Sequence, residues 1–342
     1  MRWLSDPVVD RLHSALSLPD LAGTRYRAVR HLARGGMGTV WLAQDTVLGR
    51  KVALKILDSA AESSEFAARL LREASVVARL EHPGIVPVHD AGVLPDGRAY
   101  YAMKYVEGTR LDQFVQKTTP LSERLRLFQR IAEPVAFAHS KGVLHRDLKP
   151  ENIMIGGFGE VLVLDWGTAK VMETGGVAAS EPPDHSASDS ARAPRGAPTT
   201  AHGDILGTPG YMSPEQAQGE VNALDERTDV YGLGAILAFM LACDAPGVIR
   251  PPARSWPSTT NFPRPLAAIC AKAMAPDRAA RYTAVEEMAA DVERYMEGRP
   301  VLAYPENVFE KTSRLFERHR AAIVLVAAYL LMRLLFILFS TR

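Results

Sequence analysis

The sequence predicts an α+β protein with two lobes, in which a small antiparallel β-sheet with one main helix precedes a larger, mostly helical lobe. Strand-like segments around a glycine turn and apolar residues at helical spacing after residue 121 are the basis of this prediction. With 342 residues, 47% of them hydrophobic, the chain can bury a sizeable core, which excludes a wholly disordered protein. Its net charge of +1 provides no general attraction to nucleic acid, so we expect no nucleic-acid partner.

The first lobe is expected over residues 25–106, after a leader of residues 1–24. Apolar and polar residues alternate as in strands at residues 26–32, 38–45 and 51–57. Residues 64–80 carry apolar side chains at helical spacing. These segments predict the sheet and the single main helix of this lobe.

The second lobe is expected over residues 107–298 and is predicted to be mostly helical. Apolar spacing predicts helices at residues 122–140, 229–241, 266–274 and 284–296. Residues 173–203 contain no Ile, Leu or aromatic residue, so this stretch cannot bury itself and is expected to be a disordered insertion. Residues 246–265 are rich in proline and are expected to form an irregular surface connection.

The two cysteines, Cys243 and Cys270, have no Cys or His nearby at the spacing of metal ligands. This pattern disfavours a disulfide framework and a structural zinc site. We expect both residues to be reduced, buried thiols.

The C-terminal part of the chain predicts a transmembrane helix over residues 321–339, after a juxtamembrane segment of residues 299–320. All residues of this run except Arg333 are apolar, and a helix of its length spans roughly 28 Å, close to the hydrocarbon thickness of a bilayer. Four basic residues precede the run and one follows it, which places residues 1–320 in the cytoplasm of a single-pass protein of the cell (inner or plasma) membrane. The alternative is a buried helix packed on the domain.

Two features of the first lobe indicate a site for phosphate groups. Gly35, Gly36 and Gly38 lie in a turn between two strands, where backbone N–H groups can approach phosphate oxygens. Lys55 lies in an apolar strand and needs an anionic partner, which Glu73 on the following helix can supply. The alternatives are an ordinary glycine-bearing hairpin and two solvated charges.

The strongest motif is HRDLKPEN, which begins at His145 and is followed by LDWG with Asp165. It combines Asp147, Lys149 and Asn152 with a second carboxylate after a short strand. Carboxylate and amide oxygens suit Mg²⁺, and a separate carboxylate can orient a hydroxyl nucleophile. The motif therefore indicates a site for Mg²⁺ and a polyphosphate.

In this order and at these separations, the motifs resemble those of the eukaryotic-like Ser/Thr protein kinases in their bacterial membrane-bound form, over about residues 26–298. The resemblance implies a two-lobed protein-kinase-like fold with ATP and Mg²⁺ as cofactors, and Mn²⁺ as an alternative metal. It also implies that Asp147 accepts the substrate hydroxyl proton and that Lys149 neutralises the transferring phosphoryl group. Lys55 would hold the α/β-phosphates while paired with Glu73.

The resemblance also implies the metal and nucleotide contacts. Asn152 and Asp165 would hold the metal ions. The nucleotide would be bound by the phosphate-covering loop, the neighbouring strands and the hinge between the lobes, which contribute Ala33, Arg34, Gly35, Gly36, Met37, Gly38, Val40, Ala53, Lys55, Met103, Tyr105 and Val106.

Residues 207–215 resemble the loop that receives the substrate peptide. Arg146 would bind a phosphorylated residue of the activation loop, with Thr199 and Thr200 as the expected acceptors and Thr208 as a further regulatory position. Ordinary loop polarity is the alternative interpretation of these threonines.

The resemblance also implies two buried contacts, and this sequence differs from the family pattern at three places. Glu215 would pair with Arg281, and Asp229 would brace the catalytic loop. Ala33 replaces the first glycine of the phosphate loop, Trp166 replaces the usual phenylalanine, and residues 243–266 are too few for one of the usual helices, which leaves substrate docking open.

We therefore expect a membrane-tethered Ser/Thr protein kinase that transfers the γ-phosphoryl group of ATP to protein substrates. Activation-loop autophosphorylation would activate it, and a homodimer would allow phosphorylation in trans. The alternative is a catalytically weak pseudokinase that acts as a membrane-attached scaffold, which Ala33 and the shortened region favour. Phosphotransfer to small molecules is disfavoured by the peptide-accepting loop.

Overall fold

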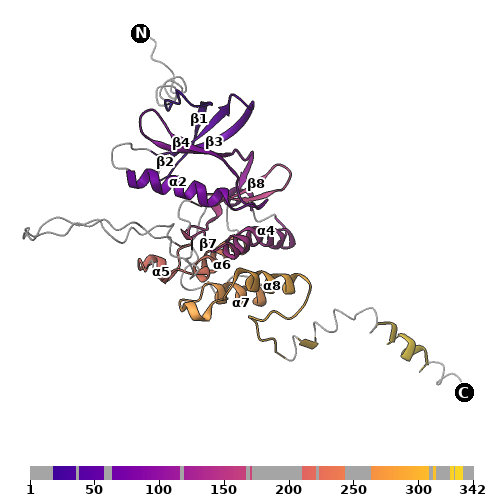
Figure 1. The fold of residues 1–342 in the computed structure, drawn as a ribbon. Helices are drawn as coiled ribbons and strands as arrows, with labels where there is room; N and C mark the ends of the chain where they lie inside the picture. Colours follow the sequence, from indigo (N-terminus) through magenta and orange to yellow (C-terminus); the bar gives the residue numbers. More distant parts are fainter. Residues whose placement is uncertain are drawn as a thin grey trace, which may run out of the picture.

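The computed structural model describes residues 18–35, 38–57, 64–115, 119–166, 170–171, 210–220, 223–242, 263–307, 311–312, 324–326 and 328–333. Figure 1 shows the β-sheet with helix α2 above a larger group of helices, so the predicted two-lobed α+β fold is confirmed. Several predicted positions lie outside the described residues: Gly36, Met37, Thr199, Thr200, Thr208, Cys243 and the expected insertion of residues 173–203.

The sheet of the first lobe has five antiparallel strands in the order β1-β2-β3-β5-β4. Their bounds, with that of the accompanying helix, are β1 Tyr26–Gly35, β2 Gly38–Asp45, β3 Arg50–Ile56, β4 Val88–Val93, β5 Ala99–Lys104 and α2 Ser64–Ala78. The three predicted strands and the helix are confirmed, with ends that differ by at most three residues. Strands β4 and β5 were not predicted. The sequence of β4, VHDAGV, has no regular alternation and forms an edge of the sheet, and the residues of β5 were assigned to the hinge between the lobes.

One face of the sheet forms its own core. Trp41, Val52, Leu54 and Ile56 are almost completely buried there, since successive residues of a strand point to opposite faces. Gly38 opens β2 where a Cβ atom would collide with the backbone carbonyl of Ile56. Only glycine therefore lets the turn after β1 lie this close to β3.

In the described part of the second lobe there are four long helices, all of which were predicted. They are α4 Leu121–Ser140, α6 Glu226–Ala242, α7 Arg264–Ala273 and α8 Val285–Met296. Helix α6 is buried on nearly all sides, so it forms the centre of the lobe. The short elements around it are β6 Gly108–Arg110, α3 Leu111–Phe114, β7 Val143–Leu144, η1 Pro150–Asn152, β8 Ile153–Gly156, β9 Val161–Val163, β10 Lys170–Val171, α5 Pro214–Ala217 and η3 Arg278–Ala280.

The irregular connection predicted for residues 246–265 is wrong at its C-terminal end, because its last two residues belong to a helix. Helix α7 begins at Arg264, within that range, because Pro265 lies in the first turn, where no N–H is needed for the helix. Residues 246–262 lie outside the described part of the chain. The buried thiol predicted for Cys270 is confirmed, and its burial raises the pKa of the thiol.

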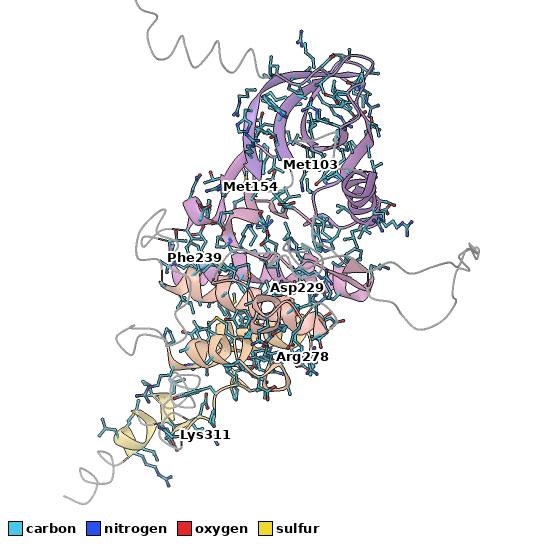
Figure 2. All side chains as sticks on the ribbon, turned by 90° about the vertical axis from the view of Figure 1, so that its left-hand side faces the viewer. Met103, Met154, Asp229, Phe239, Arg278 and Lys311 are labelled. Atoms are coloured by element: carbon cyan, nitrogen blue, oxygen red, sulfur yellow. The ribbon has the colours of Figure 1, made fainter. Side chains whose placement is uncertain are left out.

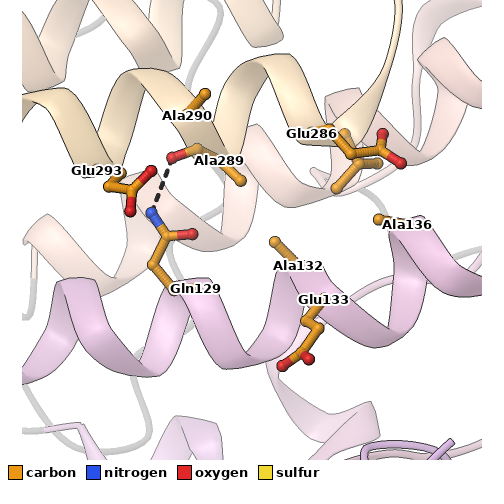
Figure 3. Close-up of a pocket in the computed structure, with 9 residues that line it drawn as sticks. Gln129, Ala132, Glu133, Ala136, Glu286, Ala289, Ala290 and Glu293 are labelled. Atoms are coloured by element: carbon orange, nitrogen blue, oxygen red, sulfur yellow. Dashed lines mark hydrogen bonds between the residues drawn. The ribbon is translucent and has the colours of Figure 1, made fainter.

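Helices α4 and α8 enclose a hollow of about 310 Å³ on the surface of the second lobe. Figure 3 shows Gln129 donating across it to the carbonyl of Ala289, at 2.8 Å, with Glu133 and Glu286 at its rim. None of the residues that line this hollow is a predicted site residue. It is therefore part of the packing between the two helices.

The carboxylate of Asp291, on α8, fastens the chain that follows the helices. It is completely buried and accepts hydrogen bonds from the N–H groups of Leu302, at 2.9 Å, and Ala303, at 3.0 Å. Arg294 and the Tyr282 hydroxyl, each at 2.9 Å, complete its contacts. The chain therefore stays attached to the lobe for several residues after α8 ends.

The predicted transmembrane helix falls mostly outside the described residues. Residues 324–326 and 328–333 are helical, and the apolar side chains among them are exposed. None of the helices formed by the described residues has both the length and the apolar character needed to cross a bilayer.

Candidate active site

Lys55 and Asp165 form an ion pair between the two lobes, with 2.8 Å between Nζ and Oδ1. Lys55 lies on β3, paired with Val40 of β2 and Tyr101 of β5, and its ammonium group lies 5.7 Å from the centre of the Tyr101 ring. Its side chain is only 10% exposed, whereas that of Asp165 is 47% exposed. The pair therefore lies where the two lobes meet, with the lysine held on the inner side and the carboxylate reaching solvent.

The electrostatics of Asp165 favour a carboxylate. Desolvation opposes its ionisation, but the charge of Lys55 and the hydrogen bond from it have the larger combined effect, so the pKa of Asp165 is lowered. Asp165 also has a φ of +56°, an uncommon conformation for a residue with a side chain. An ionised oxygen ligand is thus presented where the two lobes meet.

Two predicted catalytic residues, Asp147 and Lys149, meet the predicted metal ligand Asn152 in the catalytic loop. Lys149 Nζ lies 2.7 Å from Asp147 Oδ2, and the Asn152 amide donates to the carbonyl of Asp147, at 2.8 Å, and to its Oδ2, at 3.1 Å. Since both donors hold the same carboxylate oxygen, the direction of the Asp147 side chain is fixed. The peptide N–H of Leu164 donates to the carbonyl of Asn152, which places Asp165 next to this loop.

Asp229, on α6, holds the beginning of the catalytic loop, as predicted. Its carboxylate accepts the N–H of His145, at 2.8 Å, and the N–H of Arg146, at 2.7 Å. His139, at the end of α4, lies 2.7 Å from the same carboxylate and was not predicted. Burial opposes charge on both side chains, but their hydrogen bond and mutual attraction raise the pKa of His139 and lower that of Asp229.

The predicted pairing of Glu215 with Arg281 is confirmed. The guanidinium donates to both carboxylate oxygens, at 2.7 and 2.8 Å, and both side chains are buried. Desolvation opposes ionisation of Glu215, but the hydrogen bonds and charge of Arg281 lower its pKa. This pair holds α5 against the loop that follows α7, because Arg281 also donates to the carbonyl of Ala275.

The adenine side of the predicted site is an apolar junction between the lobes. Val106 and Leu162 are buried there, with Met103 and Met154 packed against them. Figure 2 shows Met103 and Met154 where the sheet meets the helical lobe. Residues of four different segments therefore form the surface on which a flat ring can lie.

The remaining predicted positions are located as follows. Ala53 is buried on β3, Val40 on β2 is half-buried, and Tyr105 is half-buried beside Val106. Ala33 and Arg34 are exposed at the end of β1, which Gly35 completes. Glu73 lies on α2, but its side chain is outside what the structure describes, so the predicted pairing with Lys55 stays a prediction.

The residues of this cleft fit a nucleotide triphosphate and its metal ion. Lys55 and Lys149 supply positive charge for phosphate oxygens, and Asp165 supplies a carboxylate. Asn152 uses its side-chain nitrogen, Nδ2, on Asp147, which leaves its side-chain oxygen, Oδ1, as a second hard ligand. Two protein ligands of this kind are typical of Mg²⁺, whose remaining positions are filled by phosphate and water.

A model of the protein kinase domain matches residues 26–291. The chain belongs to this family. Serine/threonine-protein kinase PknD of Protochlamydia amoebophila (strain UWE25) is 37% identical over 305 residues, which cover 80% of this chain and 30% of the relative. PknD of Chlamydia trachomatis serovar D is 37% identical over 303 residues, with 81% and 32% covered. The chain thus spans about a third of the length of these curated relatives.

The crystal structure of the Mycobacterium tuberculosis PknI kinase domain is similar to this chain with a TM-score of 0.57 and 28% identity. The similarity covers 81% of this chain and 99% of that domain. Together with the relatives, this result confirms that the chain carries a kinase domain of the bacterial serine/threonine class.

Proposed function

We propose that this kinase transfers the γ-phosphoryl group of ATP to serine and threonine hydroxyls of proteins. The observation that carries the proposal is the meeting of Lys55 and Asp165 with Asp147, Lys149 and Asn152 at one cleft between the lobes. Lys55 lies on a strand of the first lobe, far in the sequence from the other four residues, so folding brings two lysines and two aspartates together where the lobes meet.

Each residue has a defined task in the transfer. Asp147 accepts the proton of the substrate hydroxyl as its oxygen forms a bond to the γ-phosphorus, and the bond from that phosphorus to the β-phosphate oxygen breaks to release ADP. Lys149 offsets charge on the moving phosphoryl group, and Lys55 holds the α/β-phosphates. Bound Mg²⁺, held by Asn152 and Asp165, would neutralise charge on the phosphate oxygens.

The test uses the purified full-length chain with γ-labelled ATP, Mg²⁺ and a generic basic protein. Asp147→Asn and Lys55→Met should lose nearly all incorporation. Lys51→Met is the matched control, because Lys51 lies on the same strand but is exposed and pairs with the exposed Glu107. Equal incorporation by the wild type and Asp147→Asn, or none by either, would contradict the proposal and favour a scaffold.

We also propose that residues 321–339 anchor the kinase in the cell membrane, with the catalytic domain in the cytoplasm. The exposed apolar side chains of Val324, Leu325 and Leu330 support this proposal, since water does not stabilise such a surface. In carbonate extraction of cells, the wild type should stay with the membranes, and a Leu325→Lys/Leu330→Lys variant should be released. Release of both proteins would contradict the anchor.

Activation by phosphorylation of the activation loop is the third part of the proposal. Arg146, next to Asp147, is the residue that would bind the phosphate on Thr199 or Thr200. Phosphopeptide mapping of the full chain should find these threonines modified, whereas modification of serines alone would count against them. Transfer from the wild type to a Lys55→Met copy would show that the reaction occurs in trans and would support a homodimer.

A further inference from the structure

The side-chain amide of Gln216, on the short helix α5, connects two parts of the kinase. Its oxygen accepts the N–H of Ser213, at 3.0 Å, as part of the capping box that begins α5. Its nitrogen donates to the backbone carbonyl of Arg146, at 2.6 Å. One amide thus joins the end of the proposed substrate loop to the residue before Asp147.

The contact to Arg146 fixes the peptide bond that precedes Asp147. At one end of this peptide unit, the carbonyl of Arg146 accepts from Gln216, and at the other end the N–H of Asp147 donates to His145 Nδ1, at 3.2 Å. The plane of the peptide is therefore held on both sides. Because Cα of Asp147 belongs to this plane, the plane sets the position from which the carboxylate extends.

The backbone of Arg146 needs such support. Its φ is +69°, in the left-handed region that a residue with a side chain rarely adopts and that is maintained only where surrounding contacts hold it. The N–H of Arg146 is held by Asp229 and its carbonyl by Gln216. Without Gln216, the carbonyl side can rotate toward a commoner conformation, and Asp147 would move with it.

The platform that carries Gln216 is rigid. The preceding residue, Glu215, is tied to Arg281 by two hydrogen bonds and also accepts the hydroxyl of Thr228. Gln216 therefore extends from a segment that has its own contacts to the lobe, apart from its contact with the catalytic loop. It lies at the end of residues 207–215, the segment proposed to receive the substrate peptide.

We propose that Gln216 is a positioning residue for phosphoryl transfer, which holds the peptide unit before Asp147 and so couples the catalytic carboxylate to the substrate loop. This inference deepens the proposed kinase function and rests on it. Loss of Gln216 should slow the transfer step and not weaken ATP binding, because Gln216 is not among the residues assigned to the nucleotide.

Two substitutions separate this role from the capping of α5. Gln216→Glu keeps an oxygen that accepts from Ser213 but has no donor for the carbonyl of Arg146. Gln216→Leu removes both contacts. A displacement of catalytic groups by an ångström can cost about 100-fold in rate, so we expect kcat to fall about 10- to 100-fold in both variants. KM for ATP should stay within about twofold of the wild type, and Gln216→Leu, which loses both contacts, should lower the melting temperature more than Gln216→Glu.

The matched control is Gln218→Glu, the same chemical change at an exposed residue two positions further on, which should leave kcat unchanged. The measurements are steady-state kinetics of the full-length kinase on a peptide substrate and thermal unfolding of each variant. A Gln216→Glu variant with the kcat of the wild type would overturn the inference, as would a loss of kcat only in the variant that also loses stability. An inactive wild type would instead contradict the proposed function.

Discussion

The buried carboxylate of Asp291 makes a direct prediction about stability. Asp291→Asn keeps the size of the side chain but leaves one oxygen where two accept hydrogen bonds. Whichever way the amide turns, its NH₂ group faces a backbone N–H, that of Leu302 or of Ala303. One buried donor then loses its partner, and the other hydrogen bonds lose the help of the negative charge.

The magnitude follows from these contacts. An unsatisfied buried N–H costs about 1–3 kcal/mol, and a hydrogen bond that becomes neutral loses about 1 kcal/mol. Part of this loss is offset, because a neutral side chain needs no desolvation of charge. We therefore expect Asp291→Asn to lower the free energy of unfolding by about 2–4 kcal/mol, or the melting temperature by about 5–15 °C for a domain of this size.

The contribution of Asp291 to stability also depends on pH, in a direction that its pKa determines. Desolvation of Asp291 opposes its ionisation, but the hydrogen bonds that it accepts lower its pKa below the ordinary value of 3.8. Its contribution to stability is therefore present above the unfolded pKa and is lost as the pH falls through the folded pKa. The Asp291→Asn variant should lack this part of the acid sensitivity.

Thermal unfolding followed by circular dichroism at neutral and acid pH measures both effects. Asp277→Asn is the control, because Asp277 caps η3 from an exposed position, where asparagine caps equally well. A melting temperature of Asp291→Asn within about 1 °C of the wild type at neutral pH would refute the reasoning from hydrogen bonds.

Three further predictions concern the catalytic lobe. Arg281→Met should lower the free energy of unfolding by about 3–5 kcal/mol in urea titrations, because it leaves the Glu215 carboxylate buried without its partner. The ion pair of His139 with Asp229 should stabilise the kinase fully below the ordinary histidine pKa of 6.5, and this stabilisation should be lost as the pH rises through the raised pKa of folded His139. In the His139→Gln variant, the free energy of unfolding should therefore change less with pH over this range. Trp166→Phe should keep turnover within about threefold of the wild type in the same kinase assay and cost about 1–2 kcal/mol in thermal unfolding, since the indole is buried and donates to a nearby carbonyl.

The long helices could be predicted from the sequence because burial of one helix face makes apolar residues recur at helical spacing along the chain. Helices α4 and α8 show it clearly, since each has one face in the core and one in water. Helix α6 is buried on almost every side, so its apolar spacing is less distinct, and the predicted range of residues 229–241 is shorter than the observed Glu226–Ala242. The edge strand β4 has no buried face of its own and was missed.

Of the candidate site, the residues in short sequence motifs could be predicted, whereas residues that act through distant partners could not. The motifs HRDLKPEN and LDWG are short, and their residue types alone indicate a site for a metal ion and phosphate groups, so they identified Asp147, Lys149, Asn152 and Asp165. His139 and Gln216 carry no such signal, because their partners are a side chain 90 residues away and a backbone carbonyl 70 residues away. The capping-box pattern of Ser213 and Gln216 is visible as a helix start, but the second contact of the same amide can be found only in three dimensions.

The charges of the cleft explain why a metal ion belongs to the proposed reaction. Lys55 is paired with Asp165 and Lys149 with Asp147, so the four side chains at the cleft sum to zero charge before a nucleotide enters. A triphosphate brings several negative charges, and each lysine that turns toward it leaves a carboxylate without its partner. Added positive charge would offset the repulsion between these carboxylates and the phosphates, which is why the proposed reaction includes a cation held by Asn152 and Asp165.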